Sequence, residues 1–467
     1  MISRKPADAE LDPAEKHLAP QYAARFLSVP VPRSELPEGE LRPEVAHRLV
    51  HDELTLDGNP TLNLATFVTT WMEPEARLLM DECLDKNYVD QDEYPQTTEI
   101  QDRCVHILSR LFNAPPDEAG AGTATVGSSE AIHLCGLALK WRWRQRRAAA
   151  GLTGDRPNIV MGANVQVCWE KFARYFDVEP RLVPLTADRY VLGVAEALAL
   201  VDERTIAVVG ILGSTLTGQY EPIAELNDAL TELNGRTGWD VPIHVDAASG
   251  GFVAPFATPD LRWDFRLPLV RSINVSGHKY GLVYPGVGWA IWRTEADLPA
   301  DLVFHVNYLG GDEPTFNLNF SKGSSQIVAQ YYNFVRLGRA GYSGILTGLR
   351  SVAAYLAGAL NETGHFDVLS DTGALPVVCV CLRGDRPYSV FDLSQHLRQR
   401  GWIVPAYTLP PDAEHICVLR IVVRESLSRD LAGHLVADVL GAIAYFERAG
   451  GPAAQAVPTA HATKGVC

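Results

Sequence analysis

The alternation of strand-like and helical stretches between residues 158 and 292 constrains the fold of this chain more than any other feature. Short apolar runs, typical of buried strands, alternate there with stretches whose apolar residues recur at helical spacing. The strand-like runs are NIVMG, RLVPL, TIAVVGIL, VPIHV, SINVS and GWAIW, at residues 158–162, 181–185, 205–212, 241–245, 272–276 and 288–292. This alternation predicts an α/β fold in which helices wrap a mostly parallel sheet. Ligands of such sheets lie beyond the carboxyl ends of the strands, so the loops there are the candidate site.

One of these loops begins with Asp246, in the segment HVDAASGGF at residues 244–252. The aspartate ends an apolar strand and is followed by five small residues. Small side chains let a flat ring lie close to the backbone, and the carboxylate would then face the edge of that ring. The loops after two other strands supply Gln166 and Thr215, so separate parts of the chain converge on one face.

A second loop places His278 and Lys279 between the apolar runs at 272–276 and 288–292. A lysine between buried strands is poorly solvated, so the pKa of its ammonium group should fall. The neutral amine can then form a Schiff base with an aldehyde. Lys279 is the candidate for that amine, and an exposed lysine in a turn is the alternative.

The start of a long helical stretch forms a candidate anion site. Gly127, Ser128, Ser129 and Glu130 precede an apolar-periodic helix that ends before Gly151. Free N–H groups and two hydroxyls at a helix start would suit a phosphate group. A plain N-cap is the alternative, but it accounts for only one of the two serines.

Several motifs together resemble one enzyme family. HVDAASGGF followed by SGHKYG is similar to the group II decarboxylases, which depend on pyridoxal phosphate (PLP). The resemblance is narrowed to glutamate decarboxylases of bacterial type, over about residues 45 to 440, by NLATF, KNYVDQDEYPQ, GSSEA, KWRWR, SGGFVAPF, WDFRLP, YLGG and AQYY. It implies the fold type I of PLP-dependent transferases. That fold has a mostly parallel sheet of seven-stranded type with helices on both faces, and a small α+β C-terminal domain.

The resemblance also implies a PLP-dependent carboxy-lyase that converts L-glutamate to 4-aminobutyrate (GABA) and CO2. Lys279 would bind the cofactor's aldehyde and Asp246 would keep its ring nitrogen protonated, whereas Tyr308 or Lys279 would return a proton to Cα. The implied cofactor-binding residues are Ser128, Ser129, Gln166, Thr215, Asp246, Ser276, His278, Lys279 and, reaching a partner subunit's phosphate, Ser321. The implied substrate-binding residues are Thr66, Phe67, Asn87 and Asp90 for the distal carboxylate and Arg420 for the α-carboxylate.

Four segments are expected along the 467 residues: an N-terminal arm (1–60), a large PLP-binding domain (61–345), a small C-terminal domain (346–450) and a flexible tail (451–467). The length and the 47% of hydrophobic residues support a globular protein with a large core. The first forty residues lack the apolar core of an export signal, and no run reaches the roughly 18 apolar residues of a membrane span. A cytoplasmic enzyme without membrane contact is therefore expected.

Composition also restricts the partners. A formal net charge of −15 argues against nucleic acid, and the basic run at residues 141–147 is better explained by a subunit or domain interface. The eight cysteines lack the spacing of a metal site, so no metal is predicted. The tail has one lysine, no arginine and no aromatic residue, so calmodulin binding is not expected. The resemblance implies a homodimer or a higher homo-oligomer, such as a hexamer.

Three alternative functions stay open from the residues alone. Ser276 and Lys279 also satisfy the Ser-x-x-Lys pattern of serine acyl-enzymes, although no Lys-Thr-Gly or Ser-Asp-Asn motif accompanies it. A nucleotide-binding module is disfavoured because the glycine-rich stretch 285–288 lacks the third glycine of a dinucleotide loop. A PLP-dependent decarboxylase of aspartate or of an aromatic amino acid is the nearest competitor.

Overall fold

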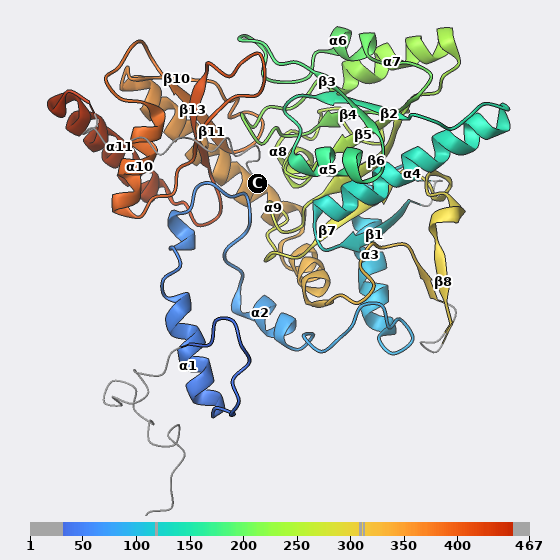
Figure 1. Ribbon diagram of the computed structural model, residues 1–467, viewed down its shortest axis with the longest axis horizontal. Helices are drawn as coiled ribbons and strands as arrows, with labels where there is room; N and C mark the ends of the chain where they lie inside the picture. The colour runs from blue at the N-terminus through green and yellow to red at the C-terminus, as the bar shows by residue number, and fades with distance from the viewer. Residues whose placement is uncertain (1–30, 117–119, 308–310, 312, 452–467) are drawn as a thin grey trace, which may run out of the picture. The chain divides into compact units, whose positions relative to one another are not determined.

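The computed structural model describes residues 31–116, 120–307, 311 and 313–451 (Figure 1). The chain divides at Pro60 into two compact units, which we describe separately. The first contains one helix among its described residues, α1 (Pro43–Leu54), which starts with a proline at its first position and is at least partly exposed throughout. All further elements belong to the second unit, apart from the short 3-10 helix η4 (Pro60–Leu62) at the boundary.

A seven-stranded sheet forms the centre of the second unit. In spatial order its strands are β1 (Ala121–Thr125), β7 (Gly288–Trp292), β6 (Val270–Val275), β5 (Ile243–Asp246), β4 (Thr205–Ile211), β2 (Asn158–Gly162) and β3 (Glu179–Val183). Only β7 runs antiparallel to its neighbours, β1 and β6, and the other pairs are parallel. The predicted mostly parallel sheet of an α/β fold is therefore confirmed.

Two strand boundaries differ from the predicted runs because of proline. β3 starts at Glu179 and ends at Val183, whereas the apolar run continues through Pro184 to Leu185. Proline has no N–H to donate to a strand ladder, and the pairing ends before Pro184, whereas Pro180 is accommodated inside β3 because β3 is an edge strand. β5 starts at Ile243 rather than at Val241 because Pro242 intervenes.

Helices cover both faces of this sheet (Figure 1). The helices of this part of the chain are α2 (Pro74–Asp81), α3 (Pro95–Leu111), α4 (Ser128–Ala149), α5 (Val167–Tyr175), α6 (Val194–Ala199), α7 (Ile223–Thr237), α8 (Ala254–Ala257) and α9 (Ser325–Glu362), of which α2 and α8 contact α9 rather than the sheet. Successive side chains of a strand point to opposite faces. Accordingly, Ile159 and Met161 of β2 pack with α4 and α5 in one apolar cluster, and Val160 belongs to the other cluster with α7 residues. Burial on both faces explains why these strands are apolar at every position.

A smaller antiparallel sheet of four strands forms the C-terminal part. Its strands are β10 (Phe366–Val368), β11 (Val377–Leu382), β13 (Cys417–Val422) and β12 (Ala406–Thr408), and it packs with α10 (Val390–Leu397) and α11 (Arg429–Ala449). A two-stranded ribbon, β8 (Phe304–Val306) and β9 (Glu313–Thr315), and the 3-10 helices η5 (Gly250–Phe252), η6 (Glu295–Asp297), η7 (Ala300–Leu302) and η8 (Arg398–Arg400) complete the described elements. This arrangement confirms the predicted small α+β domain.

α9 joins the two parts of the second unit. It contacts α2 and α3 beside the large sheet and β10 and β11 in the small one. Gly338 interrupts its helical backbone with a φ of 55° and a ψ of −170°. In the described part of the chain, α9 alone is long and apolar enough to cross a membrane, a criterion that a core helix also meets. The helix passes residue 345, so the domain boundary predicted there stays a prediction.

The basic run at residues 141–147 pairs with carboxylates of its own chain. Arg142 of α4 forms an ion pair with the buried Asp297, and Arg146 forms one with Asp240 at 2.6 Å. These intrachain pairs account for two of its arginines without a nucleic acid or a second subunit.

A glycine on β7 generates a prediction about packing. A Cβ atom at Gly288 would lie 2.5 Å from the carbonyl carbon of Gly127 and 2.7 Å from the nitrogen of Ser128, both backbone atoms. Gly288→Ala should therefore lower the free energy of unfolding by about 1–3 kcal/mol, as overpacking does. Denaturant unfolding checks this, with Gly235→Ala in α7 as the matched control. Gly235 has open space around it, so alanine there should stabilise the protein by up to about 1 kcal/mol.

Candidate active site

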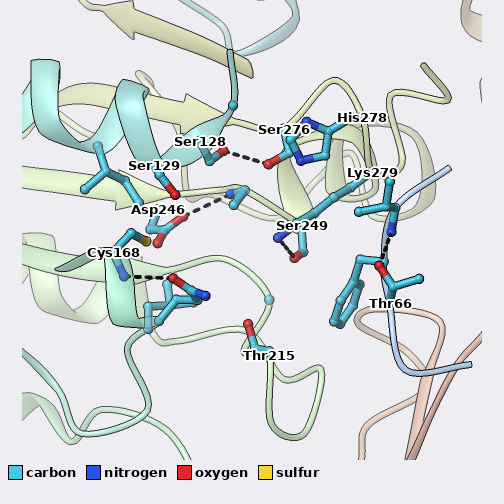
Figure 2. A pocket seen from close by; sticks show the side chains of 18 of the residues that line it. Thr66, Ser128, Ser129, Cys168, Thr215, Asp246, Ser249, Ser276, His278 and Lys279 are labelled. Carbon is cyan, nitrogen blue, oxygen red and sulfur yellow. Dashed lines mark hydrogen bonds between the residues drawn. The ribbon is translucent and has the colours of Figure 1, made fainter. Parts of the chain in front are cut away.

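A cavity of about 450 Å³ lies at the carboxyl ends of β2, β4, β5 and β6 (Figure 2). It is lined by the segment 65–68, the start of α4, the loops that follow these strands, and Arg420 of β13. This is the edge where the strand alternation predicts a ligand site. Ser128, Ser129, Gln166, Thr215, Asp246, Ser276, His278 and Lys279 all line it, and so do Thr66, Phe67 and Arg420.

One end of the cavity can accept an anion. The hydroxyl oxygens of Ser128, the first residue of α4, and Ser276 lie 2.7 Å apart. His278 packs beside Gly127, where a Cβ atom would come within 3.2 Å of the imidazole ring. Among the described residues, the buried Nδ1 of His278 has no hydrogen-bond partner. Burial lowers the pKa of this histidine to about 4, so hydroxyls, backbone N–H groups and a neutral ring form the cradle.

The carboxylate of Asp246 is held at another side of the cavity by three N–H groups. Trp169 Nε1 donates to Oδ2 at 2.9 Å. Asn274 Nδ2 and the backbone N–H of Ala248 donate to Oδ1 at 2.9 Å and 3.1 Å. Hydrogen bonds to a carboxylate favour its charged form. Asp246 can therefore present a fixed negative charge to a ligand although it is only 5% exposed.

Lys279 extends toward Asp246 from the loop after β6 (Figure 2). Its Nζ donates to Ser249 Oγ at 3.1 Å and lies 5.4 Å from the centre of the Phe67 ring. Burial lowers the pKa of this amine, and the nearby charge of Asp246 opposes that effect. The hydroxyl of Thr69 donates to the backbone carbonyl of Lys279 at 2.7 Å, and this hydrogen bond anchors the loop.

Arg420 places a buried cation at the opposite wall. Its Nη1 donates to the carbonyl of Thr215 at 2.6 Å, and its Nη2 donates to the carbonyl of Ala65. The guanidinium also lies 5.3 Å from the Phe67 ring and 5.7 Å from that of Tyr407. Nε is buried without a partner, and no carboxylate in the described ranges lies within ion-pair distance of this arginine. A buried cation without a counter-ion is expensive, so this wall is suited to a carboxylate ligand.

The small residues after Asp246 serve two different purposes. Ala248 and Ser249 line the cavity, as the predicted close approach of a flat ring requires. Gly250 and Gly251 instead pack against backbone and core atoms. A Cβ at Gly250 would lie 2.2 Å from the carbonyl oxygen of Leu212, and one at Gly251 would lie 2.7 Å from the Val275 side chain.

Four of the predicted site residues are not placed in this cavity. Asn87, Asp90 and Ser321 lie in a separate patch, where the Asn87 side chain accepts from the N–H of Lys322 at 3.2 Å. Asn87 Nδ2 and Ser321 Oγ are 3.5 Å apart. Within one chain, these residues therefore do not reach the ligand site. Tyr308 lies outside the described residues.

Three residues that form hydrogen bonds with the predicted Asp246 and Lys279 were not identified from the sequence. Ser249 was hidden in a run of small residues, although its hydroxyl is the partner of Lys279. Trp169 and Asn274 hold Asp246 from α5 and β6, which are distant in sequence. The signal that could have found Asn274 is the pairing of two alternating segments, His244-x-Asp246 and Ser272-x-Asn274.

The donor set fits PLP. The unpartnered Nδ1 of His278 and the cradle beside Gly127 provide room and donors for a phosphate. Asp246 provides a carboxylate for a ring nitrogen, and Lys279 provides a desolvated amine for an aldehyde. All three lie in one cavity.

Comparisons with known proteins agree with this geometry. The family described as "Pyridoxal-dependent decarboxylase conserved domain" matches residues 37–383. Glutamate decarboxylase from Solanum lycopersicum is 58% identical over 91% of this chain and 85% of its own length. Glutamate decarboxylase from Aliivibrio fischeri is 50% identical over 91% of this chain and 92% of its own length. The solved glutamate decarboxylase from Lactobacillus brevis has a TM-score of 0.88 and 48% identity, covering 91% of this chain and 98% of that chain.

The buried His278 generates a prediction about pH. Its pKa is about 4 in the folded protein, below the usual 6.5 that an unfolded chain should show. Between these pH values the unfolded chain binds a proton that the folded protein does not, so the free energy of unfolding decreases as the pH falls. In the cofactor-free protein, His278→Gln should remove roughly 2 kcal/mol of this decrease between about pH 6.5 and about pH 4.5.

Denaturant unfolding at several pH values measures the effect. His434→Gln is the control, because solvent reaches that exposed ring in the folded and unfolded states alike. Equal pH slopes for the wild-type protein and His278→Gln would contradict the buried, neutral state of His278.

Proposed function

The chain belongs to the pyridoxal-dependent decarboxylase family, and we propose that it is an L-glutamate α-decarboxylase that forms 4-aminobutyrate and CO2. The observation that carries this proposal is a single cavity that combines Lys279, Asp246 and the unpaired guanidinium of Arg420. Relatives that carry the name glutamate decarboxylase cover about nine-tenths of the chain at 47% to 58% identity.

Bound PLP supplies an electron sink that accepts the electron pair left when CO2 departs from the substrate. Lys279 would bind the cofactor through its Nζ, and the cradle of serines and His278 would hold its phosphate. Asp246 Oδ1 and Oδ2 already accept protein N–H groups, and a carboxylate fixed in this way keeps a proton on the facing ring nitrogen. Gln166 and Thr215 line the walls between these ends.

Arg420 is the proposed partner of the substrate's α-carboxylate. Thr215 and Ala65 fix two of its N–H groups through their carbonyls, which leaves the buried Nε side for a ligand. This anchor orients the carboxylate that is lost. Phe67 lies against both Arg420 and Lys279 and fills the space between the two side chains, which keeps water out of it.

Proton return to Cα is assigned to Lys279, with Tyr308 as the second candidate. Burial lowers the pKa of Lys279, which makes the neutral amine easier to form than in an exposed lysine, so the group can take up and deliver a proton. Ser249 Oγ, 3.1 Å away, holds the amine inside the cavity.

We also propose a cytoplasmic homodimer or higher homo-oligomer in which Asn87, Asp90 and Ser321 complete the cavity of a partner subunit. Two observations support this. These residues lie in one patch away from their own chain's cavity, and the adjacent apolar side chains Leu318 and Phe320 are 48% and 40% exposed. Exposed apolar groups beside polar ones are typical of protein interfaces.

The substrate and the lysine are tested together. Purified protein should release CO2 from L-glutamate and not from L-aspartate or L-tyrosine, measured with carboxyl-labelled substrates. Lys279→Ala should lower turnover by roughly three orders of magnitude or more, because it removes the amine that binds the cofactor and moves the proton.

Borohydride reduction separates this role from a loss of fold. It should attach PLP covalently to the wild-type protein and to the control Lys171→Ala, whose lysine is exposed on α5. Lys279→Ala should stay folded and unlabelled. Covalent labelling of that variant at one site would assign the role to another lysine.

Mixing two inactive variants tests the shared cavity. Lys279→Ala disables a chain's own site, and Asn87→Trp should block the site of its partner. If sites are built from two chains, a mixed dimer has one intact site, so co-refolded protein should regain about a quarter of wild-type activity. Each variant refolded alone is the control. No recovery, with mixed dimers shown by mass, would place Asn87 outside the partner's cavity.

A further inference from the structure

The carboxylate of Asp246 is the end of a chain of hydrogen bonds that continues into the core. Asn274 donates through Nδ2 to Asp246 Oδ1 at 2.9 Å, and its Oδ1 lies 2.8 Å from Nε2 of His244. The other ring nitrogen of His244, Nδ1, lies 2.7 Å from Ser272 Oγ. His244, Ser272 and Asn274 are all fully buried and do not line the cavity.

The strand register creates this chain. In the parallel pair β5 and β6, His244 stands opposite Ser272 and Asp246 stands opposite Asn274. Alternate residues of a strand point to the same face, so all four side chains lie on one face of the sheet. Trp169 of α5 covers that face, with its ring 5.2 Å from the His244 ring and its Nε1 on Asp246.

The donors and acceptors can be arranged in only one way. The ionised carboxylate of Asp246 can only accept, so the amide nitrogen of Asn274 must face it. Asn274 Oδ1 then faces His244 and can only accept, which requires the proton of the imidazole to be on Nε2. A neutral ring leaves Nδ1 as the acceptor of the Ser272 hydroxyl proton. Complete burial lowers the pKa of His244 to about 4, which keeps the ring neutral.

We propose that His244 and Asn274 are positioning residues for Asp246, and that Ser272 fixes the tautomer of His244. The relay runs from Ser272 through His244 and Asn274 to the carboxylate. It presents an N–H group to Asp246 Oδ1, and Trp169 presents one to Oδ2. The carboxylate is thereby held in one orientation, in which it can face the ring nitrogen of a bound cofactor. This inference rests on the proposed function, because it concerns the cofactor that Asp246 is proposed to contact.

A purely structural role would produce a different pattern of effects. A buried polar cluster that only supports the sheet would, when broken, weaken every ligand of the cavity equally. The relay acts on one atom of the cofactor, the ring nitrogen. Its loss should therefore weaken PLP and leave the deaza analogue, in which carbon replaces that nitrogen, unaffected.

The test measures the affinity of the cofactor-free protein for PLP and for 1-deaza-PLP. His244→Leu removes the donor to Asn274 and should weaken PLP binding by up to about 10-fold, the upper end of what one neutral hydrogen bond contributes, with no change for the analogue. His244→Gln places an amide N–H where Nε2 stands and should restore PLP affinity to within about 3-fold of wild type. His244→Asn places its amide near the Nδ1 position and should not restore it. The comparison of His244→Gln with His244→Asn shows whether the position of the N–H donor, rather than the presence of an amide, determines the affinity for PLP.

Two further measurements keep the test decisive. Ile273→Val, between Ser272 and Asn274 on β6 but facing the other way, is the control for general core damage and should change neither affinity. If His244→Leu does not fold, Asn274→Leu carries the same expectation. In the wild-type protein, ¹⁵N NMR of labelled histidine, assigned with His244→Gln, should show a neutral Nε2–H ring for His244.

The outcomes distinguish the relay from the proposed function. Wild-type protein that neither binds PLP nor decarboxylates glutamate would refute the proposed function. Wild-type protein that does both, with His244→Leu weakening PLP and its analogue equally, would overturn the relay alone. A charged or Nδ1–H ring of His244 would also overturn it.

Discussion

The burial of charge at the carboxyl edge of one sheet is the constraint on which this structure depends. An amine, a carboxylate and a guanidinium line a single cavity there, and each would be better solvated in water. Asp246 is stabilised by three N–H groups, whereas Arg420 receives, among the residues that the structure describes, carbonyl oxygens and no carboxylate. These two environments have different consequences for ligand binding. The carboxylate is complete without a ligand, and the guanidinium is not, so ligand binding should be driven most strongly at the Arg420 wall.

The sequence predicts the fold well because its signals are local. Apolar strands buried on both faces alternate with helices, and glycine or proline marks most boundaries. The errors are also local, since the run through Pro184 and the run that includes Pro242 extend beyond the strands that form there. The key groups Asp246 and Lys279 were found because each follows a recognisable strand. Trp169 and Asn274 were not found, because their contacts depend on the register of β5 and β6 and on the packing of α5. The packing of α5 cannot be read from a single sequence, and the register is indicated there only by the alternating segments His244-x-Asp246 and Ser272-x-Asn274.

The predicted site residues lie in two places in the structure. The strand-end residues Asp246, Thr215 and Lys279 gather in one cavity, because parallel strands bring their carboxyl ends to the same edge. Of the residues implied by resemblance alone, Thr66, Phe67 and Arg420 also line this cavity, whereas Asn87 and Ser321 lie elsewhere, against each other. The separation of Asn87 and Ser321 from the cavity is what the proposed site shared between chains requires.

A lowered lysine pKa is not sufficient to identify the reactive amine. Burial lowers the pKa of Lys322 to about 8, and its Nζ donates to the carbonyl of Ala124 and lies 4.3 Å from the Tyr88 ring. Lys322 therefore shares the desolvation of Lys279, but it is tied to a backbone acceptor and does not line the cavity. Among the described residues, Lys279 donates to the hydroxyl of Ser249, in a cavity that also holds Asp246. The carbonyl that Lys322 contacts is shared with Asn317, whose Nδ2 donates to it at 3.0 Å, so Lys322 belongs to a local network of hydrogen bonds. The position of the amine in the ligand cavity, together with its lowered pKa, distinguishes the reactive lysine from the structural one.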